Sequence, residues 1–440
     1  MTGKVLTLSL CFVTLAVNAI AEEVNVKDKE NGDKEKTEVL KKKSRLTLGG
    51  YGEAVMTRNF YSDEWQRYTN AEKYKDAPSH GRFDLPHVVL FIGYDFGKGW
   101  SMGSEIEFEH GGTESAVEME SEETGEYESE IERGGEVALE QFWIQKSFCR
   151  EFNIRMGHII VPVGLTNQHH MPTEFFTVYR PEGENTIFPC TWHETGISLW
   201  GRTNDWRYEV MFLPGLDSDR FGTQGFIHDG AGSPYEFKIA NAYAGAFRID
   251  NYSIAGLRIG LSGYFGSSFS NSLTKKTKYK EYNGEVMIGA IDFHYNAHNW
   301  IVRGNFDWGH LNDSKQITKF NKENMSSASP SPRTAVASDA VATGVEAGYN
   351  LFSQFTKVRD TEHKLYLFGR YEYYDSMAKV ADGIMDYEWC GKHRMAVGLN
   401  YYPMKEIVIK AEYSKRFFKS KYNNEPSFSL GIAYAGFFIK

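Results

Sequence analysis

The sequence predicts an all-β protein: a transmembrane antiparallel β-barrel of about sixteen strands, with one constriction loop folded into the lumen. Three observations predict this fold. Short segments that alternate apolar and polar residues recur from residue 45 to 440, their connections are alternately short and long, and the chain opens with an export signal. After that signal no run of about 18 consecutive apolar residues exists, which argues against helical membrane spans.

The first 21 residues are typical of a secretory signal peptide. Lys4 supplies the positive charge, residues 5–17 are almost entirely apolar, and Ala19-Ile20-Ala21 forms a small-x-small cleavage site. Residues 22–44 are dense in both charges and lack aromatics, so they cannot bury a core. We expect a signal peptide at 1–21, a charged periplasmic leader at 22–44 and an outer-membrane barrel at 45–440.

The composition supports a barrel in a Gram-negative outer membrane. Aromatic residues make up 15% of the 440 residues, yet the mean hydropathy is only −0.47. High aromatic and high polar content coexist where alternate residues face lipid and water. The net charge of −9 gives no support for nucleic-acid binding. The expected partners are the lipid bilayer, lipopolysaccharide and small hydrophilic solutes.

Residues 100–109 show the strand pattern most clearly. The apolar side chains of this segment fall on even positions, namely Trp100, Met102, Ile106 and Phe108, and the carboxylates of Glu105, Glu107 and Glu109 on odd ones. Period two places the two sets on opposite faces of a strand. Similar faces recur through the chain up to a last aromatic strand, 427–440.

The connections between these segments separate into two classes. Short ones are expected at 97–99, 149–151, 203–205, 250–252, 297–299 and 403–405, with a longer one at 353–363. Long ones are expected near 58–82, 110–135, 160–193, 214–236, 266–283, 310–342, 375–391 and 418–426. Short turns on one rim and long loops on the other are typical of outer-membrane barrels. Closure follows because an open edge in lipid would leave backbone groups unpaired.

The third long connection is the most distinctive segment. Its prolines prevent ladder pairing, and its apolar residues need burial, for which the lumen is the natural place. It resembles the phosphate-selective porin O and P family in three motifs: the Pro162-x-Gly164 entry, the Phe175-x-x-Val178-x-Arg180-Pro181 step, and the Pro189-x-x-Trp192-x-Glu194-x-Gly196 exit. Weaker resemblance in strand order extends over nearly the whole barrel.

The resemblance implies a sixteen-stranded barrel narrowed by its third loop, and a homotrimer. It also implies that Arg180 and Glu182 lie near the constriction. An equally open alternative is that both residues only fix the loop to the barrel wall.

The strand faces predict a lumen with charges of both signs. The cations are Arg155, Arg207, Arg258, Arg303, Arg370, Arg394, Lys410 and Arg416, and the anions are Glu105, Glu107, Glu209, Asp292, Asp307, Glu372 and Glu412. A ladder of guanidinium groups would pass an anion along successive weak contacts. Pairing of opposite charges across a water-filled pore is the alternative, so the selectivity of the pore stays open.

No metal site, cofactor or active site is predicted. The acidic second connection, between Glu114 and Glu136, is typical of a solvated segment and lacks the spacing of a calcium loop. The histidines in or beside the third loop, His158, His169, His170 and His193, form no helical i, i+4 pair, although Glu174 and Glu194 are near in sequence. Cys149, Cys190 and Cys390 follow the signal, and a bridge between the last two is possible.

These patterns favour a porin, a passive diffusion channel rather than an enzyme. A substrate-specific channel for phosphate, another anion or a sugar is the first alternative, with Tyr366 and Tyr374 as a short stacking track. Conductance blocked by the solute would identify it. An outer-membrane hydrolase is the second alternative, and a single serine replacement would abolish its activity.

Overall fold

The computed structural model describes residues 45–112, 118–119, 131–132, 136–231, 239–272, 281–324 and 334–440. The expected signal peptide, the leader and most of the acidic second connection lie outside these residues. Within the described part of the chain, no helix has the length and apolar character to cross a membrane.

Seventeen of the described strands form one closed antiparallel sheet. They are β1 (Leu46–Asn59), β2 (Gly81–Asp84), β3 (His87–Gly97), β4 (Trp100–Glu109), β7 (Glu136–Ser147), β8 (Asn153–Ile160), β9 (His193–Arg202), β10 (Trp206–Pro214), β11 (Tyr243–Ile254), β12 (Leu257–Ser267), β13 (Glu285–Ala297), β14 (Trp300–Leu311), β15 (Asp339–Asn350), β16 (Lys364–Lys379), β17 (Lys392–Met404), β18 (Ile407–Phe417) and β19 (Glu425–Ile439).

Closure comes from β1, which pairs with β19 along one edge and with β2 and β3 along the other. Strands β2 and β3 contact successive stretches of β1, so together they occupy one position in the barrel. The described residues thus make a closed barrel of sixteen strand positions, and the predicted fold is confirmed. The even count lets both ends of the chain lie at the same rim.

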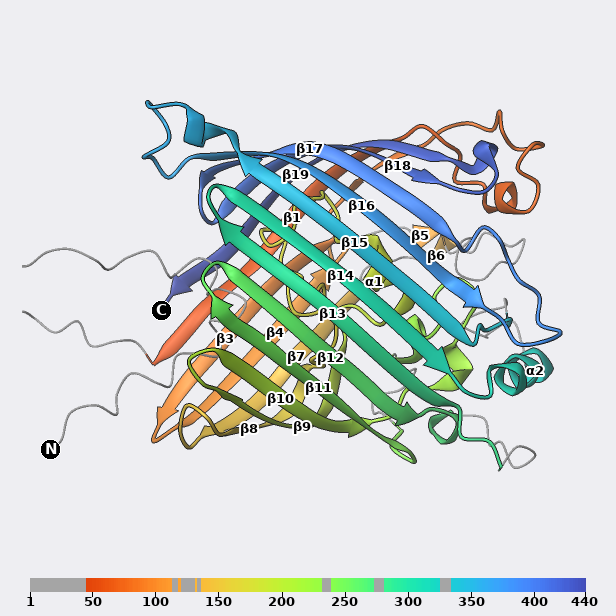
Figure 1. Ribbon diagram of the computed structural model, residues 1–440, viewed down its shortest axis with the longest axis horizontal. Coiled ribbons are helices and arrows are strands. Elements are labelled where there is room, and N and C mark those ends of the chain that lie inside the picture. Colours follow the sequence, from red (N-terminus) through yellow and green to blue (C-terminus); the bar gives the residue numbers. More distant parts are fainter. Residues whose placement is uncertain are drawn as a thin grey trace, which may run out of the picture.

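The remaining elements lie in the connections. They are the small sheet of β5 (Glu118–Met119) and β6 (Ile131–Glu132), the helices α1 (Glu182–Ile187) and α2 (Ser314–Asn324), and the 3-10 turns η1 (Trp65–Tyr68), η2 (Ser218–Arg220), η3 (His228–Ala231), η4 (Phe269–Asn271), η6 (Leu351–Gln354) and η7 (Lys421–Asn423). In Figure 1, β1 begins and β19 ends at the rim with the short turns, and α2 lies at the opposite rim with the long connections.

The short turns agree with prediction at most sites. His298 and Asn299 both have positive φ, as a tight hairpin turn requires. The turn expected at 250–252 is wrong, because β11 continues to Ile254 and the chain reverses at 255–256. Asp250 resembles a turn residue in sequence, but its carboxylate binds Arg248 and Arg258 inside the barrel. The turn expected at 403–405 likewise lies later, at 405–406.

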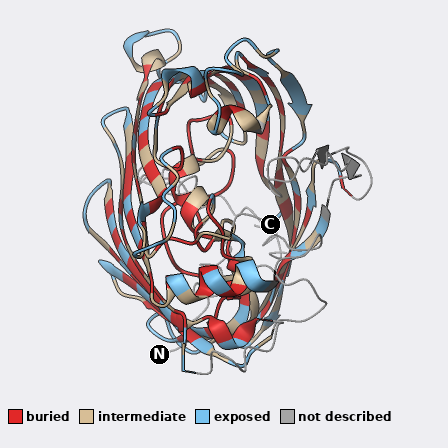
Figure 2. Cartoon of the chain, turned by 90° about the vertical axis from the view of Figure 1, so that its right-hand side faces the viewer, coloured by how far each residue is buried: buried red, intermediate tan, exposed pale blue. Residues whose placement is uncertain are grey.

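The two faces of each strand differ as predicted. On β10, Val210 and Phe212 point outward and are more than half exposed, while Glu209 and Met211 are buried inside. Figure 2 shows the same alternation of buried and exposed residues along the barrel wall. Trp100, Trp206 and Trp300 each begin a strand directly after a short turn and face outward, half-exposed, which is the position of an interfacial aromatic girdle.

A lipid-facing wall predicts a depth-dependent cost for an outward charge. Val397 lies in the middle of β17 and faces outward, whereas Met404 ends that strand at the short-turn rim. Val397→Arg should lower the free energy of unfolding from lipid vesicles by about 2–4 kcal/mol, because the charge enters the apolar band. The matched Met404→Arg should cost no more than about 1 kcal/mol. Urea titration of both variants measures this difference, and equal costs would contradict a lipid-facing β17.

Candidate functional site

The third loop, residues 161–192, lies inside the barrel. It leaves β8 and returns to β9, and its two ends are joined where the Val161 N–H donates to the Trp192 carbonyl over 2.9 Å. Figure 2 shows buried segments of the chain crossing the interior of the barrel. Near the loop entrance the Glu184 carboxylate accepts the backbone N–H groups of Leu165, Thr166 and Asn167 at 2.8–3.1 Å. This carboxylate folds the loop back on itself.

Gly164 makes that fold possible. Its φ is +80°, and a Cβ there would meet the Glu184 carboxylate oxygen at 2.2 Å. The barrel wall also binds the backbone of Gly164. Its N–H donates to the Ser262 hydroxyl, and its carbonyl accepts from Arg248. The Pro-x-Gly motif recognised in the sequence is therefore the point where the chain leaves the sheet and turns inward.

The middle of the loop is fixed to the barrel wall through its backbone. The Lys410 ammonium donates to the carbonyls of Phe175 and Thr177 at 2.9 and 2.7 Å. In return, the Val178 N–H donates to the Glu412 carboxylate at 2.8 Å. Side chains of the wall thus replace the strand partners that an irregular backbone lacks, which satisfies its buried polar groups.

Small residues on β15 make room for the loop. The inward face of this strand carries Ala340, Ala342, Gly344 and Gly348. A Cβ on Gly348 would lie 2.3 Å from the ring of Phe176, so only glycine allows that ring to pack there. Further along, α1 approaches the wall closely enough that a Cβ on Gly183 would touch Ala342.

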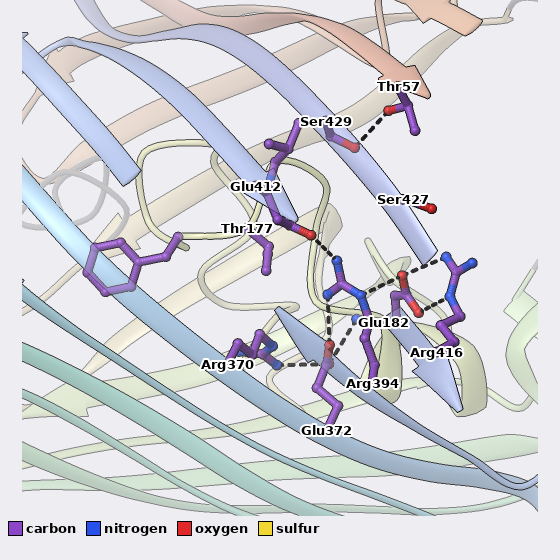
Figure 3. A network of polar contacts seen from close by, with 12 residues as sticks. Thr57, Thr177, Glu182, Arg370, Glu372, Arg394, Glu412, Arg416, Ser427 and Ser429 are labelled. Atoms are coloured by element: carbon purple, nitrogen blue, oxygen red, sulfur yellow. Dashed lines mark hydrogen bonds and ion pairs between the residues drawn. The ribbon is translucent and has the colours of Figure 1, made fainter. Parts of the chain in front are cut away.

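Glu182 is the centre of an ion-pair network, drawn in Figure 3. Its carboxylate binds Arg416 at 2.7 Å and Arg394 at 3.1 Å, and it accepts the Tyr374 hydroxyl. Burial alone would raise the pKa of Glu182, but the Arg394 and Arg416 guanidinium groups hold it well below its ordinary value. Glu372 continues the network, pairing with Arg394 and accepting the Glu182 N–H. This is the position expected if Glu182 fixes the third loop to the barrel wall.

The other cations predicted from the strand faces point inward and have partners on the same or an adjacent strand. The pairs are Arg207 with Glu209 and Asp250, Arg258 with Asp250 and Asp292, Arg303 and Arg370 with Glu346, and Arg394 with Glu412. Arg155 hydrogen-bonds Gln145 and lies over the Trp143 ring. The guanidinium groups thus form a neutralised wall from β10 to β18.

A different surface faces the loop from β3, β4 and β7. Glu105, Glu107 and Glu140 lie there, and in the described residues none of the three is ion-paired with Lys or Arg. Arg180 reaches toward this side, donating to the Tyr51 hydroxyl of β1 at 3.4 Å and to the His170 carbonyl. The two predicted residues therefore point to different sides of the lumen. Arg180 points toward the acidic side, and Glu182 points toward the arginine wall.

Several lumenal residues, Arg248 and Glu140 among them, were not predicted from the sequence. Arg248 is almost fully buried on β11 and pairs with Asp250 and Asp292; the outward Phe247 and Ile249 beside it were the available signal. Glu140 lies at a β-bulge, where the apolar alternation of β7 slips by one residue between positions 139 and 142. A strict period of two cannot find a residue of this kind.

The structure places the three cysteines and the histidines near the third loop in different contacts. Cys149, Cys190 and Cys390 are free thiols, so the possible Cys190–Cys390 bridge is not formed. His169 contacts Glu174 at 3.2 Å, and His158 hydrogen-bonds Thr195. His193 instead lies 3.8 Å from Glu140, on the acidic side of the lumen.

Removing the Glu182 charge tests whether the network holds the loop. Glu182→Gln leaves Arg394 and Arg416 short of one buried partner, and we expect a loss of about 1–3 kcal/mol in unfolding free energy. The control is Glu174→Gln, whose partner in the described residues is His169 rather than an arginine. Single-channel recording should show larger or noisier conductance for Glu182→Gln only. Identical traces for both variants would mean that these ion pairs do not hold the loop.

Comparison with known proteins places the barrel among porin structures. No family model matches the chain. An uncharacterised protein of Aquifex aeolicus is 26% identical over 396 residues, covering 88% of this chain and 80% of the relative. Among solved structures, Pseudomonas putida OprB has a TM-score of 0.53 at 10% identity, covering 89% of this chain and 94% of its own.

The anion-selective porin of Comamonas acidovorans has a TM-score of 0.51 at 10% identity and covers 89% of this chain and 99% of its own. Salmonella typhi OmpF, in complex with daunomycin, has a TM-score of 0.50 at 11% identity, with coverages of 89% and 97%. At such identities the likeness concerns the fold alone, and the resemblance to the phosphate-selective family remains a prediction. The chain shares its closed sixteen-stranded barrel with bacterial outer-membrane porins.

Proposed function

We propose that this protein is a diffusion porin, which lets small hydrophilic solutes or ions cross the outer membrane of a Gram-negative bacterium. The third loop, with Arg180 at its inner surface, narrows the pore. The observation that carries the proposal is the attachment of that loop to the inner wall of the barrel. Its backbone is bound by wall residues such as Lys410 and Glu412, while a separate charged surface on β4 and β7 faces it.

We further propose that the pore prefers cations. The arginines from β10 to β18 are neutralised by carboxylates of the same wall, for example Arg370 by Glu346 and Glu372. Glu105 lacks such a partner in the described residues and accepts from Gln141, so its carboxylate sets the sign of the field along the passage. Fixed carboxylates in a narrow, low-dielectric passage concentrate cations and repel anions.

A substrate-specific channel receives less support from the lumen. The two tyrosines that could have formed a stacking track contribute to loop attachment instead. Tyr374 donates to Glu182, and the Tyr366 ring packs 5.4 Å from that of Phe176. The guanidinium groups that could have served a phosphate ladder are ion-paired, which lowers the electrostatic attraction that an anion would feel.

The assembly and the cellular setting belong to the same proposal. A signal peptide at 1–21, a periplasmic leader at 22–44 and contacts with lipopolysaccharide fit an exported barrel with long outer connections. A homotrimer is proposed on the family resemblance and the porin fold. These features describe a passive, non-enzymatic channel.

Conductance of the purified, folded protein in planar bilayers tests the proposal. We expect stepwise ion currents, and a reversal potential in a KCl gradient with the sign of cation preference. A folded protein that adds no conductance would contradict the porin function, and the sign for anion preference would contradict the charge assignment alone.

Two variants that each remove one negative charge, at different places in the barrel, locate the source of the selectivity. Glu105→Gln removes an inward carboxylate that accepts from Gln141, and should shift the reversal potential toward anion preference. Glu151→Gln removes the same charge from an exposed turn at the short-turn rim and should leave the potential nearly unchanged. Equal shifts in the two variants would show that selectivity arises outside the lumen.

A further inference from the structure

Two carboxylates on the acidic side of the lumen are buried and form no ion pair with lysine or arginine in the described residues. Glu107 on β4 is 3% exposed and Glu140 on β7 is 4% exposed. In the described residues their ion contacts are with histidines only, His87 for Glu107 and His193 for Glu140. Buried charges in proteins are paired or coordinate a metal, because an isolated buried carboxylate is strongly disfavoured.

A β-bulge aims Glu140 at this position. Gln141 pairs with Glu105 and Leu139 with Ile106, so Glu140 is the additional residue of β7. Glu140 and Gln141 are consecutive and both are buried, although successive residues of a regular strand face opposite sides. Bulges that redirect a side chain are frequent beside functional sites.

One oxygen of Glu140 has no hydrogen-bond donor. Its Oε1 accepts the Thr191 hydroxyl at 2.8 Å, whereas the buried Oε2 receives no hydrogen bond from an N–H or hydroxyl group, and the Glu107 carboxyl lies beside Glu140. The Nε2 atom of His193, 3.8 Å from Glu140, is also buried and unbonded. An unsatisfied carboxylate oxygen next to a second carboxylate and an imidazole is an available ligand for a cation.

The adjacent strands supply a ready ligand set. His87 begins β3 and faces Glu107 and Glu109 on β4, and one ligand atom from each lies within 4.8 Å of the other two. The His87 Nδ1 atom is 2.7 Å from Glu107 and 3.9 Å from Glu109. Ligands held about 2.1 Å from a tetrahedral zinc ion stand about 3.4 Å apart, so small side-chain rotations suffice.

We propose that His87, Glu107 and Glu109, with Glu140 behind them, form a binding site for a divalent transition-metal ion of the zinc type. Imidazole nitrogen together with carboxylate oxygen favours Zn²⁺ and similar ions over Ca²⁺ and Mg²⁺, which prefer oxygen ligands alone. The bound ion neutralises the buried carboxylates. This inference does not depend on whether the pore conducts ions.

The site is open to the outer side of the lumen. His87 begins β3 and Glu109 ends β4, so both lie toward the rim with the long connections. Their side chains are 16% and 35% exposed, whereas Glu107 beneath them is closed off. A cation can therefore enter from the mouth. The positive charge of Arg180 also acts on Glu107.

Zinc binding by the refolded full chain, stripped with EDTA, tests the site by equilibrium dialysis. We expect one Zn²⁺ per chain, and at least a tenfold loss of affinity in His87→Asn and in Glu107→Gln. Glu109→Gln adds a variant at a partly exposed position, which should fold even if Glu107→Gln does not. The matched control is His310→Asn, because His310 also contacts a carboxylate, Asp339, at 2.8 Å but has no third ligand of the His, Cys, Asp or Glu type among the described residues.

The result that supports the site is zinc binding that is lost in the three site variants and retained in His310→Asn. Equal binding by site and control variants, or no binding by the wild-type chain, overturns it. Ca²⁺ that competes with Zn²⁺ at similar concentration would overturn the transition-metal assignment. The measurement needs no channel activity, so failure of the site and failure of the porin proposal are distinguished.

Discussion

The structure depends on one constraint: no backbone N–H or C=O group can be left without a partner where water is excluded. In the wall this constraint closes the sheet, because β1 must pair with β19 to remove the last free edge. In the lumen it decides where the third loop can lie. An irregular backbone is tolerated there only where side chains take the place of strand partners, and Lys410, Glu412 and Glu372 do so.

The same requirement explains the charge arrangement. Wall carboxylates that accept loop N–H groups must themselves be neutralised, and neighbouring arginines on β14, β16 and β17 do this. The part of the wall that binds the loop therefore carries many charged side chains, and these neutralise one another in ion pairs. Glu105 on β4 accepts from Gln141 rather than from the loop, and the proposed cation preference rests on its charge. Loop attachment and the proposed selectivity are in this way consequences of one charge arrangement.

Much of the fold could be predicted from the sequence, because period-two alternation and turn residues are local signals. The alternation of short and long connections also predicted the approximate number of strands and the rim of the barrel at which each connection lies. Asp250 was assigned to a turn since an Asp-Asn pair usually marks one, and only its three arginine contacts show that it belongs to a strand. Glu140 was missed because a bulge is invisible to a strict period.

The site was less predictable, since it is made by contacts between distant residues. The sequence indicated that Arg180 and Glu182 matter, but not that they face opposite sides of the loop. The alternating faces also predicted the inward arginines without their partners, so anion selectivity and charge pairing both stayed open, with pairing favoured. The pairings join strands in a register that the sequence pattern alone does not specify.

The most direct measurement is the single-channel conductance of a chain in which residues 165–180 are replaced by a short Gly-Ser linker. If the third loop lies across the lumen and narrows the pore, conductance in symmetrical KCl should rise several-fold while the barrel still folds. An unchanged conductance in a folded barrel would contradict the account, because the loop would then not limit the passage.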